Sequence, residues 1–340
     1  MINGKIGVAV IGSGRAGMIH ARNFARGING AVLAAMVDPV EEAVKKACGE
    51  LEIEIGYQDY YQALKDDRID ALVVVTPTVY HRDIVVAAAE AGKHILCEKP
   101  MAMNTRECDE MIQAADKNKV KLQIAFMRRF DRDFMTAKER IDGGEIGEVV
   151  LVKSLTHGPS VPQPWMYDIR KSNGPLAEVN SHDIDTLRWF TGGEFSEVYA
   201  IAGNYRCPEA AAEFPDFYDN VVMNCRFSNG MQGVIDGAVS VKYGYDARTE
   251  ILGTKGVMTV GHLDDTSVIS VSSEKEMVHP VVKSWRNLFI DAYRGEDQGF
   301  IDAIREDSVP KVTGHDGKMA VAVVNAGNTS IIEKRPVSLG

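Results

Sequence analysis

The strongest constraint on the fold is a glycine-rich turn near the start of the chain. A short apolar segment over residues 5–11 runs directly into Gly12-Ser13-Gly14-Arg15-Ala16-Gly17, a G-x-G-x-x-G motif. Residues 18–25 then have helical periodicity, and a second apolar segment over residues 31–37 ends in Asp38, 21 positions after Gly17. This order of strand, glycine turn, helix, strand and acid is typical of the βαβ unit that binds dinucleotides.

Each part of this motif has a physical task. Gly12 permits the tight turn, Gly14 lets a pyrophosphate approach the backbone, and Gly17 lets the helix pack close to the strand. The N-terminal end of the helix offers free N–H groups to the phosphates. The residues expected to contact the cofactor here are Gly12, Ser13, Gly14, Arg15 and Ala16.

Asp38 indicates which dinucleotide binds. Its carboxylate can accept hydrogen bonds from ribose hydroxyls, and its charge would repel a 2′-phosphate. Residues 39–42 contain no arginine that could bind such a phosphate. We therefore expect NAD rather than NADP. The alternative is a glycine-rich turn that binds nothing.

Strand and helix patterns alternate as far as residue 125, which predicts a doubly wound parallel sheet. Residues 71–75 form a continuous, valine-rich apolar segment, as expected for a parallel strand that is buried on both faces. Further strands are expected near residue 57 and over residues 94–97 and 121–125, and further helices over residues 60–65, 79–91 and 105–118.

Ligands of such sheets bind outside the carboxyl ends of the strands, so residues that follow strands are site candidates. Thr76 and Thr78 follow one strand, and Glu98 and Lys99 follow the next. We expect all four to lie at the cofactor, and Lys99 to be functional rather than an ordinary surface lysine. His81 either contacts the cofactor or has a structural role.

The pattern changes near residue 125. A helix over residues 130–141 precedes a series of mainly antiparallel strands, with hairpin turns at residues 228–230 and 253–256. We expect strands over residues 149–155, 197–203, 220–227, 231–238, 249–252 and 257–260, and helices over residues 285–306 and 317–334. The sequence thus predicts an NAD-binding Rossmann domain over residues 1–124. It also predicts an α+β domain over residues 125–340, for substrate binding and oligomerisation, with an open, mostly antiparallel sheet covered by helices.

A segment of the second domain, residues 173–185, is dense in reactive side chains. If its second half is helical, Glu178, His182 and Asp185 recur at i, i+4 and i+7 and share one face. A carboxylate one turn from an imidazole can hold its tautomer and raise its basicity. The alternative is a solvated face with an incidental histidine. Trp165, a little earlier, either stacks on a sugar ring or belongs to the core.

Composition excludes several other classes of function. The formal net charge of −10 argues against nucleic acids and anionic membranes as main partners. The five cysteines are scattered without a C-x-x-C motif, which favours a reducing compartment over a disulfide framework or a zinc site. We find no signal-peptide pattern and no apolar segment of membrane-spanning length, so a cytoplasmic protein is expected. The histidines and acids show no metal-ligand spacing.

Taken together, these motifs resemble the glucose–fructose oxidoreductase/inositol dehydrogenase (Gfo/Idh/MocA) family. The likeness covers the glycine turn, a Glu98-Lys99-Pro100 signature and the segment from Asn173 to Asp185, which aligns with the family's G-G-x-L-x-D-x-G-x-H-x-x-D pattern. Within the family, residues 126–131 and 243–246 look most like inositol dehydrogenases. Three departures are Asn173 and Asn180 in place of glycines, and Glu178 in place of the usual aspartate.

The resemblance implies a mechanism and a substrate class. Lys99 and His182 would be catalytic, with Glu178 orienting the imidazole, and a secondary hydroxyl of a cyclic polyol or sugar would be oxidised by hydride transfer to NAD. Either Lys99 or His182 could be the main base. The residues expected to contact the substrate are Lys99, Arg128, His157, Trp165, His182, Asp185 and Tyr245.

The family's habit of pairing subunits implies a homodimer or homotetramer. Two other functions stay open at this point. One is a non-catalytic NAD(H)-binding sensor or regulator, and the other is an NAD-dependent glycosidase or dehydratase without net redox change.

Overall fold

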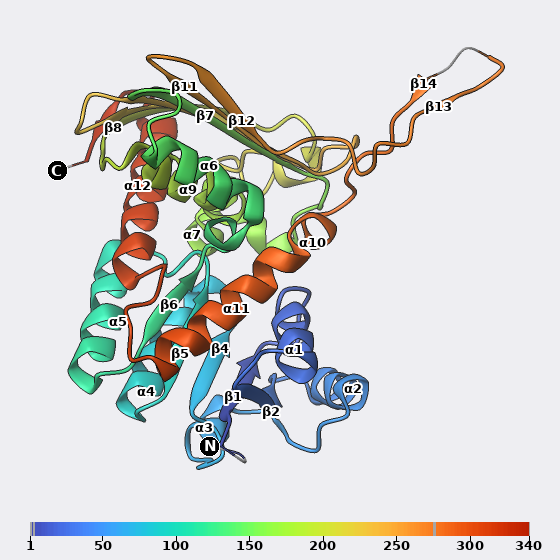
Figure 1. Cartoon of the computed structure of the whole chain (residues 1–340), viewed down its shortest axis with the longest axis vertical. Coiled ribbons are helices and arrows are strands. Elements are labelled where there is room, and N and C mark those ends of the chain that lie inside the picture. Colours follow the sequence, from blue (N-terminus) through green and yellow to red (C-terminus); the bar gives the residue numbers. More distant parts are fainter. Residues whose placement is uncertain (1, 3, 275–276, 340) are drawn as a thin grey trace. The chain divides into compact units, whose positions relative to one another are not determined.

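The computed structural model describes residues 2, 4–274 and 277–339. The chain packs into two compact units (Figure 1). Unit 1 comprises Met1–Phe130 and Asp291–Val321, and unit 2 comprises Asp131–Ile290 and Ala322–Gly340.

Unit 1 contains a six-stranded sheet in the order β3-β2-β1-β4-β5-β6, in which every pairing is parallel. Every residue of β1 and β4 is buried, because helices cover both faces of the sheet. The predicted doubly wound sheet is therefore confirmed. The strands are β1 (Ile6–Ile11), β2 (Ala31–Val37), β3 (Gly56–Tyr57), β4 (Ala71–Val74), β5 (His94–Glu98) and β6 (Leu122–Ala125).

The helices of unit 1 follow the predicted alternation. The segment predicted as one helix over residues 79–91 begins with a 3₁₀ turn, and Asn104 caps α5 by accepting the Glu107 N–H at 3.0 Å. The helical elements are α1 (Gly17–Arg26), α2 (Glu41–Leu51), α3 (Tyr60–Leu64), η1 (Thr78–Tyr80), α4 (His81–Glu90), α5 (Thr105–Asn118), η2 (Met127–Phe130) and α11 (Ile290–Arg305).

The placement of α11 differs from the predicted division of the chain, which assigned all residues after 124 to a second domain. Asp291–Val321 packs with unit 1. On α11, Asp297 is wholly buried and accepts a hydrogen bond from the Asn23 amide of α1 at 2.8 Å. Gln298 exchanges hydrogen bonds with the backbone of Asn29. These contacts join residues about 270 positions apart, beyond the reach of local patterns.

Unit 2 contains a seven-stranded sheet in the order β12-β11-β7-β10-β9-β8-β15. Its pairings are antiparallel except for β7 with β10, which confirms the predicted mostly antiparallel sheet. The strands are β7 (Val149–Gly158), β8 (Phe195–Gly203), β9 (Asn220–Phe227), β10 (Gln232–Val239), β11 (Asp246–Gly253), β12 (Val257–Val260) and β15 (Val337–Ser338).

Helices cover one face of this sheet. The α9 helix contacts β7, and α8 contacts β9 and β10. The Ser330 hydroxyl of α12 accepts the N–H of Ala200 in β8 at 3.0 Å. The opposite face, here called the open face, exposes apolar side chains such as Ile201, Val222 and Leu252. The helical elements are α6 (Arg132–Asp142), η3 (Pro164–Tyr167), α7 (Ile169–Ser172), α8 (Gly174–Glu178), α9 (Ser181–Thr191), η4 (Pro208–Ala210), α10 (Trp285–Leu288) and α12 (Gly314–Glu333), whose first turns belong to unit 1.

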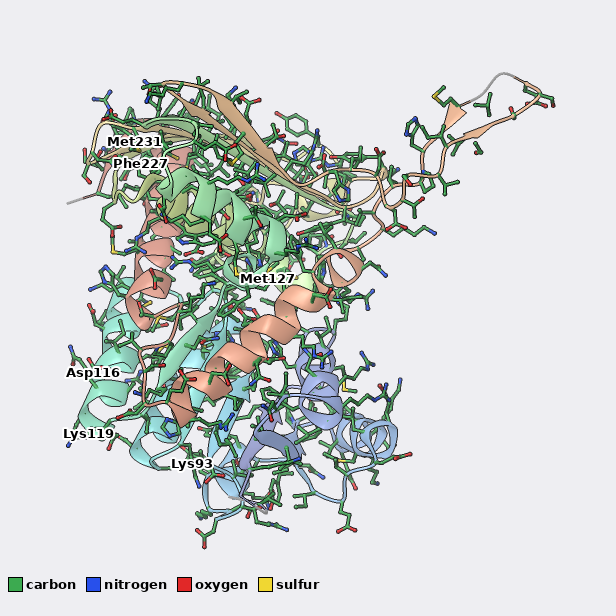
Figure 2. The ribbon with its side chains drawn as sticks, in the orientation of Figure 1. Lys93, Asp116, Lys119, Met127, Phe227 and Met231 are labelled. Atoms are coloured by element: carbon green, nitrogen blue, oxygen red, sulfur yellow. The ribbon has the colours of Figure 1, made fainter. Side chains whose placement is uncertain are left out.

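Both predicted hairpins are present. Phe227 and Met231 lie side by side across the β9–β10 turn (Figure 2), where the Phe227 N–H donates to the Met231 carbonyl oxygen at 3.0 Å and Gly230 supplies the positive φ of 86°. The second hairpin joins β11 to β12. An additional short hairpin, β13 (Ser270–Val271) with β14 (Met277–Val278), extends from unit 2 and was not predicted.

No helix within the described part of the chain is long and apolar enough to cross a membrane. All five cysteines are free thiols.

Candidate active site

The glycine turn after β1 has the geometry that its sequence predicts. Gly12 adopts a φ of 102°, and a Cβ on Gly17 would lie 1.9 Å from the Gly12 carbonyl oxygen. Only glycine therefore allows α1 to approach β1 this closely. Gly14 is exposed, and a Cβ there would meet nothing within 4 Å. Its small size serves no internal contact, which agrees with a backbone surface kept clear for a pyrophosphate.

Ala16 precedes α1 and provides no side-chain cap. The first N–H groups of the helix are thus not consumed by a capping side chain. Arg15 is an exposed residue of the same turn. These features fit a phosphate-binding helix N-terminus.

Asp38 closes the turn. One carboxylate oxygen accepts the N–H and the hydroxyl of Ser13 at 2.9 and 2.6 Å, and the other accepts the Val40 N–H at 3.0 Å. A carboxylate has about four acceptor positions, so these three bonds leave capacity for one ribose hydroxyl. The Asp38 side chain is thus held in one orientation before any ligand arrives.

Thr76 and Thr78 follow β4, as predicted. The Thr76 hydroxyl oxygen is buried and has no hydrogen-bond partner among the described residues. Buried polar groups are rarely left without partners, so this oxygen fits a site completed by a ligand. The NAD-binding assignment therefore agrees with the residues present.

His81 has a packing role in this structure. It is buried, and its ring nitrogens lie 2.8 Å from the Thr76 carbonyl oxygen and 3.0 Å from that of Pro100. Burial lowers the pKa of His81. The ring thus joins the turns after β4 and β5, and its contact with a cofactor stays a prediction.

Glu98 and Lys99 end β5. Glu98 is buried and accepts the Lys99 backbone N–H at 2.9 Å, while Lys99 is half-buried and precedes a cis peptide bond to Pro100. Burial would raise the pKa of Glu98, but hydrogen bonding to His20 and the charges of His20 and Lys99 lower it. The first residue of this signature therefore fixes the backbone of the second.

The arginine pair on η2 is largely buried. Arg129 forms an ion pair with Asp316 at 3.0 Å, within unit 1. Arg128, the predicted substrate contact, is 1% exposed.

The reactive segment of unit 2 is not one continuous helix. Glu178 ends α8, and α9 begins at Ser181. The N–H groups of Val179 and Asn180 both point to the Pro175 carbonyl oxygen, so the helical frame slips between them. The expectation that Glu178, His182 and Asp185 share one face of a single helix was therefore wrong for Glu178.

His182 and Asp185 do lie on α9, three residues apart, and are 7% and 2% exposed. Such a spacing brings both side chains to one side of the helix. The alternative of a solvated face with an incidental histidine does not apply, because the surrounding residues are buried as well.

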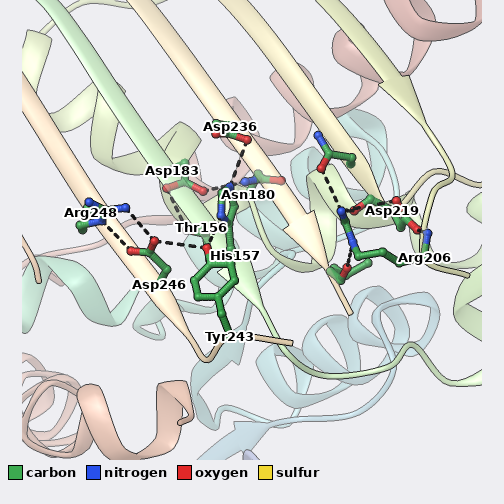
Figure 3. Close-up of polar contacts among 12 residues, drawn as sticks. Thr156, His157, Asn180, Asp183, Arg206, Asp219, Asp236, Tyr243, Asp246 and Arg248 are labelled. Atoms are coloured by element: carbon green, nitrogen blue, oxygen red, sulfur yellow. Dashed lines mark hydrogen bonds and ion pairs between the residues drawn. The ribbon is translucent and has the colours of Figure 1, made fainter. Parts of the chain in front are cut away.

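Asp183 anchors the first turn of α9 to the helix-covered face of the sheet (Figure 3). One of its carboxyl oxygens accepts hydrogen bonds from Ser154 and Thr156 of β7 at 2.6 and 2.9 Å. The other accepts the Asn180 side-chain amide at 2.8 Å. Asp183 is wholly buried, and sequence reasoning missed it. Its position next to His182 was the only available signal.

His157 is placed on the open face of the sheet. Side chains alternate along a strand, so His157 points away from the face that Thr156 shares with α9. Its ring nitrogens lie 2.5 Å from the Tyr243 hydroxyl and 3.1 Å from Asp236, and the chain of polar contacts continues to Asp246 (Figure 3). The structure thus does not bring His157 to the α9 cluster.

The two remaining predicted substrate contacts differ in exposure. Tyr245 is buried and packs edge-on against Phe289, with ring centroids 6.4 Å apart. Trp165 lies in η3 and is 39% exposed, so it is not a core residue and stacking on a ligand is the open alternative. The described residues hold no group of three or more histidine, cysteine or acidic side chains arranged to bind a metal.

A Rossmann sheet with a glycine turn, followed by a mostly antiparallel sheet that helices cover on one face, is the architecture expected of an NAD-binding oxidoreductase. Residues 6–126 match the model of an oxidoreductase family with an NAD-binding Rossmann fold, and residues 134–259 match the GFO/IDH/MocA C-terminal domain. The chain belongs to the GFO/IDH/MocA family.

Known relatives cover nearly the whole chain. A myo-inositol 2-dehydrogenase of Thermotoga maritima is 35% identical over 98% of both chains. An NAD⁺-dependent scyllo-inositol 2-dehydrogenase of Bacillus subtilis is 32% identical over 98% of this chain and 96% of the relative. A solved scyllo-inositol dehydrogenase of Lactobacillus casei, with bound NAD(H) and scyllo-inositol, is 26% identical, covers 98% of this chain and 99% of its own, and has a TM-score of 0.89.

Proposed function

We propose that this chain is an NAD-dependent dehydrogenase that oxidises a secondary hydroxyl of an inositol or a related cyclic sugar. The observation that carries the proposal is the full-length similarity to inositol dehydrogenases, together with the retained Glu98-Lys99-Pro100 signature and His182. Both the redox cofactor and the polyol class follow from these relatives.

The residues divide the chemical work. The cofactor, when bound, accepts a hydride from the carbon that bears the hydroxyl. His182 takes the hydroxyl proton as general base, and Glu178 is the proposed orienting carboxylate. Lys99 hydrogen-bonds the reacting oxygen, and its positive charge stabilises the developing alkoxide. Arg128, Trp165, Asp185 and Tyr245 are the proposed contacts to the rest of the substrate, whereas His157 is set apart from them by its place on the open face.

The first test is an assay of NADH formation over a panel of inositols, aldoses and anhydrosugars, with product analysis alongside. We expect NADH to accumulate with at least one cyclic polyol. Binding of NADH without turnover would favour a sensor, and product without accumulation of NADH would favour a glycosidase or dehydratase.

Site-directed variants test the two catalytic residues. Lys99→Ala and His182→Ala should each lower kcat by about a hundredfold or more, since each removes acid–base or electrostatic stabilisation of the transition state. A suitable control is Arg140→Ala, an exposed residue of α6 whose partner is Glu145. If the kcat of a Lys99 or His182 variant equals that of this control, the substituted residue is not catalytic.

We also propose a homodimer or homotetramer in the cytoplasm. Apolar side chains exposed on the open face, 63% for Ile201 and 43% for Leu252, support pairing of two subunits through this sheet. The free thiols support a reducing compartment. Light scattering measures the mass in solution, and cell fractionation tests the location.

A further inference from the structure

A buried ionisable cluster lies directly behind the Lys99 turn in unit 1. It joins His20 of α1, Glu98 of β5 and Asp297 of α11, whose exposed fractions are 0%, 6% and 0%. The His20 Nδ1 atom lies 2.6 Å from Asp297 Oδ1, and its Nε2 atom lies 3.4 Å from Glu98 Oε1. Three elements far apart in the sequence therefore meet at one imidazole.

The cluster connects to Lys99 through a single side chain. The two carboxyl oxygens of Glu98 have different partners. Oε1 faces His20, and Oε2 accepts the Lys99 backbone N–H at 2.9 Å. The ring of His20 is confined from its other side by Tyr293, which packs edge-on with a centroid distance of 5.4 Å. Asp297 is itself held by the Asn23 amide. The position of Glu98 thus depends on a ring that has little room to move.

The charge of the cluster agrees with this arrangement. Each ring nitrogen faces a carboxyl oxygen, and only an imidazolium can donate to both. Burial alone would lower the pKa of His20, but Asp297 and Glu98 raise it well above its ordinary value. A wholly buried ring that contacts a carboxyl group at each of its nitrogens has little freedom to move.

We propose that His20 is a positioning residue for Lys99, acting through Glu98 on the backbone from which the lysine side chain projects. This inference rests on the proposed function, in which Lys99 stabilises the reacting oxygen. A displacement of about 1 Å at a catalytic group costs up to about a hundredfold in rate. The effect should fall on kcat, because Lys99 acts on the oxygen at which charge develops in the transition state.

Two conservative substitutions separate the contacts of the ring. The amide nitrogen of asparagine lies close to where Nδ1 of a histidine lies, and that of glutamine close to where Nε2 lies. His20→Asn should therefore keep the Asp297 contact and lose Glu98, whereas His20→Gln should keep Glu98 and lose Asp297. We expect kcat to fall about 10- to 100-fold in His20→Asn and by less than about threefold in His20→Gln.

Glu296 supplies a matched control from the same buried region. It precedes Asp297, is wholly buried, and its carboxyl oxygens have no hydrogen-bond partner among the described residues. Burial raises its pKa well above the usual value, and glutamine is the isostere of the protonated form that burial favours. Glu296→Gln should leave kcat unchanged, which shows that a change within the cluster region is not by itself harmful.

A second measurement does not depend on activity. Hydrogen exchange of the Lys99 amide, followed by mass spectrometry on overlapping peptides that begin at or before residue 97 and extend past residue 99, reports directly on the bond to Glu98. We expect faster exchange in His20→Asn than in His20→Gln or the wild type. Equal exchange in all three proteins would overturn the proposal, as would a greater loss of kcat in His20→Gln than in His20→Asn. If the wild type oxidised no polyol, the proposed function would fail while the exchange result still decided the role of His20.

Discussion

Asp183→Ala should destabilise unit 2 substantially. The substitution removes the shared acceptor of three side chains in a wholly buried site. The Ser154 hydroxyl keeps the Thr249 hydroxyl at 3.0 Å, so the loss falls on Thr156 and on the Asn180 amide. At about 1–3 kcal/mol for each buried donor that loses its acceptor, the free energy of unfolding should fall by about 2–6 kcal/mol.

Asp183→Asn should cost less, which makes the two variants a matched pair. The amide oxygen of asparagine can still accept from Ser154 and Thr156, but its NH₂ group would face the Asn180 NH₂. The Asn180 side-chain oxygen has no hydrogen-bond partner among the described residues, so a half-turn of that amide provides an acceptor. We expect a loss of about 1–2 kcal/mol, the cost of one imperfectly satisfied group.

Urea denaturation followed by far-UV circular dichroism measures both losses. Glu145→Ala is the control, because its ion pair with Arg140 is exposed and should contribute less than about 1 kcal/mol. If Asp183→Ala unfolds within 1 kcal/mol of this control, the hydrogen-bond reasoning is refuted.

Three further predictions concern unit 1. Gly14→Ala should fold normally and should weaken NADH binding, as measured by fluorescence titration. Gly17→Ala should instead lower the melting temperature, because its Cβ would lie 1.9 Å from the Gly12 carbonyl oxygen. Equal melting temperatures of Gly17→Ala and the wild type would contradict this reasoning. Asp38→Ala should weaken NAD binding and narrow its advantage over NADP, and an unchanged ratio of the two dissociation constants would remove Asp38 from cofactor selection. Because the pKa of Glu296 is raised in the folded chain, its carboxyl group keeps its proton above pH 4.5, where the same group in the unfolded chain ionises. The free energy of unfolding of the wild type should therefore decline with rising pH relative to that of Glu296→Gln, by up to about 1.4 kcal/mol per pH unit. Parallel plots of unfolding free energy against pH for the two proteins would contradict the raised pKa.

The Rossmann sheet was predictable because its signals are local. Each strand is a short apolar segment, several of the turns carry glycine or proline, and the glycine motif requires a particular backbone path. The hairpin at Asn229-Gly230 was predictable for the same reason. These features depend on residues fewer than about ten positions apart.

The slip between α8 and α9 was not predictable from periodicity. Neither Val179 nor Asn180 is a strong helix breaker, and the spacing of Glu178 and His182 suits a continuous helix. The Asn180 side chain instead bonds to Asp183, a local hydrogen bond that competes with regular helix geometry. Whether α8 and α9 join into one helix therefore depends on contacts with β7, where Ser154 and Thr156 hold Asp183.

The cluster around His20 illustrates a different limit. His20 is a wholly buried residue of α1. Its partner Asp297 lies 277 positions away on a helix that was assigned to the other domain. No rule of sequence spacing links residues so far apart. The contact of the His20 ring with the Asp297 carboxyl group therefore became visible only in the structure.

The discontinuity of unit 1 also bears on how the chain is made. During translation, Met1–Phe130 emerges from the ribosome long before Asp291–Val321 has been synthesised. That later segment supplies the carboxylate that faces His20. Until then, the nascent nucleotide-binding half holds an imidazole and a glutamate in an interior without their third member. The cofactor-binding half should therefore mature late, after unit 2 has been translated, and a fragment that ends at residue 124 should be a poor substitute for it.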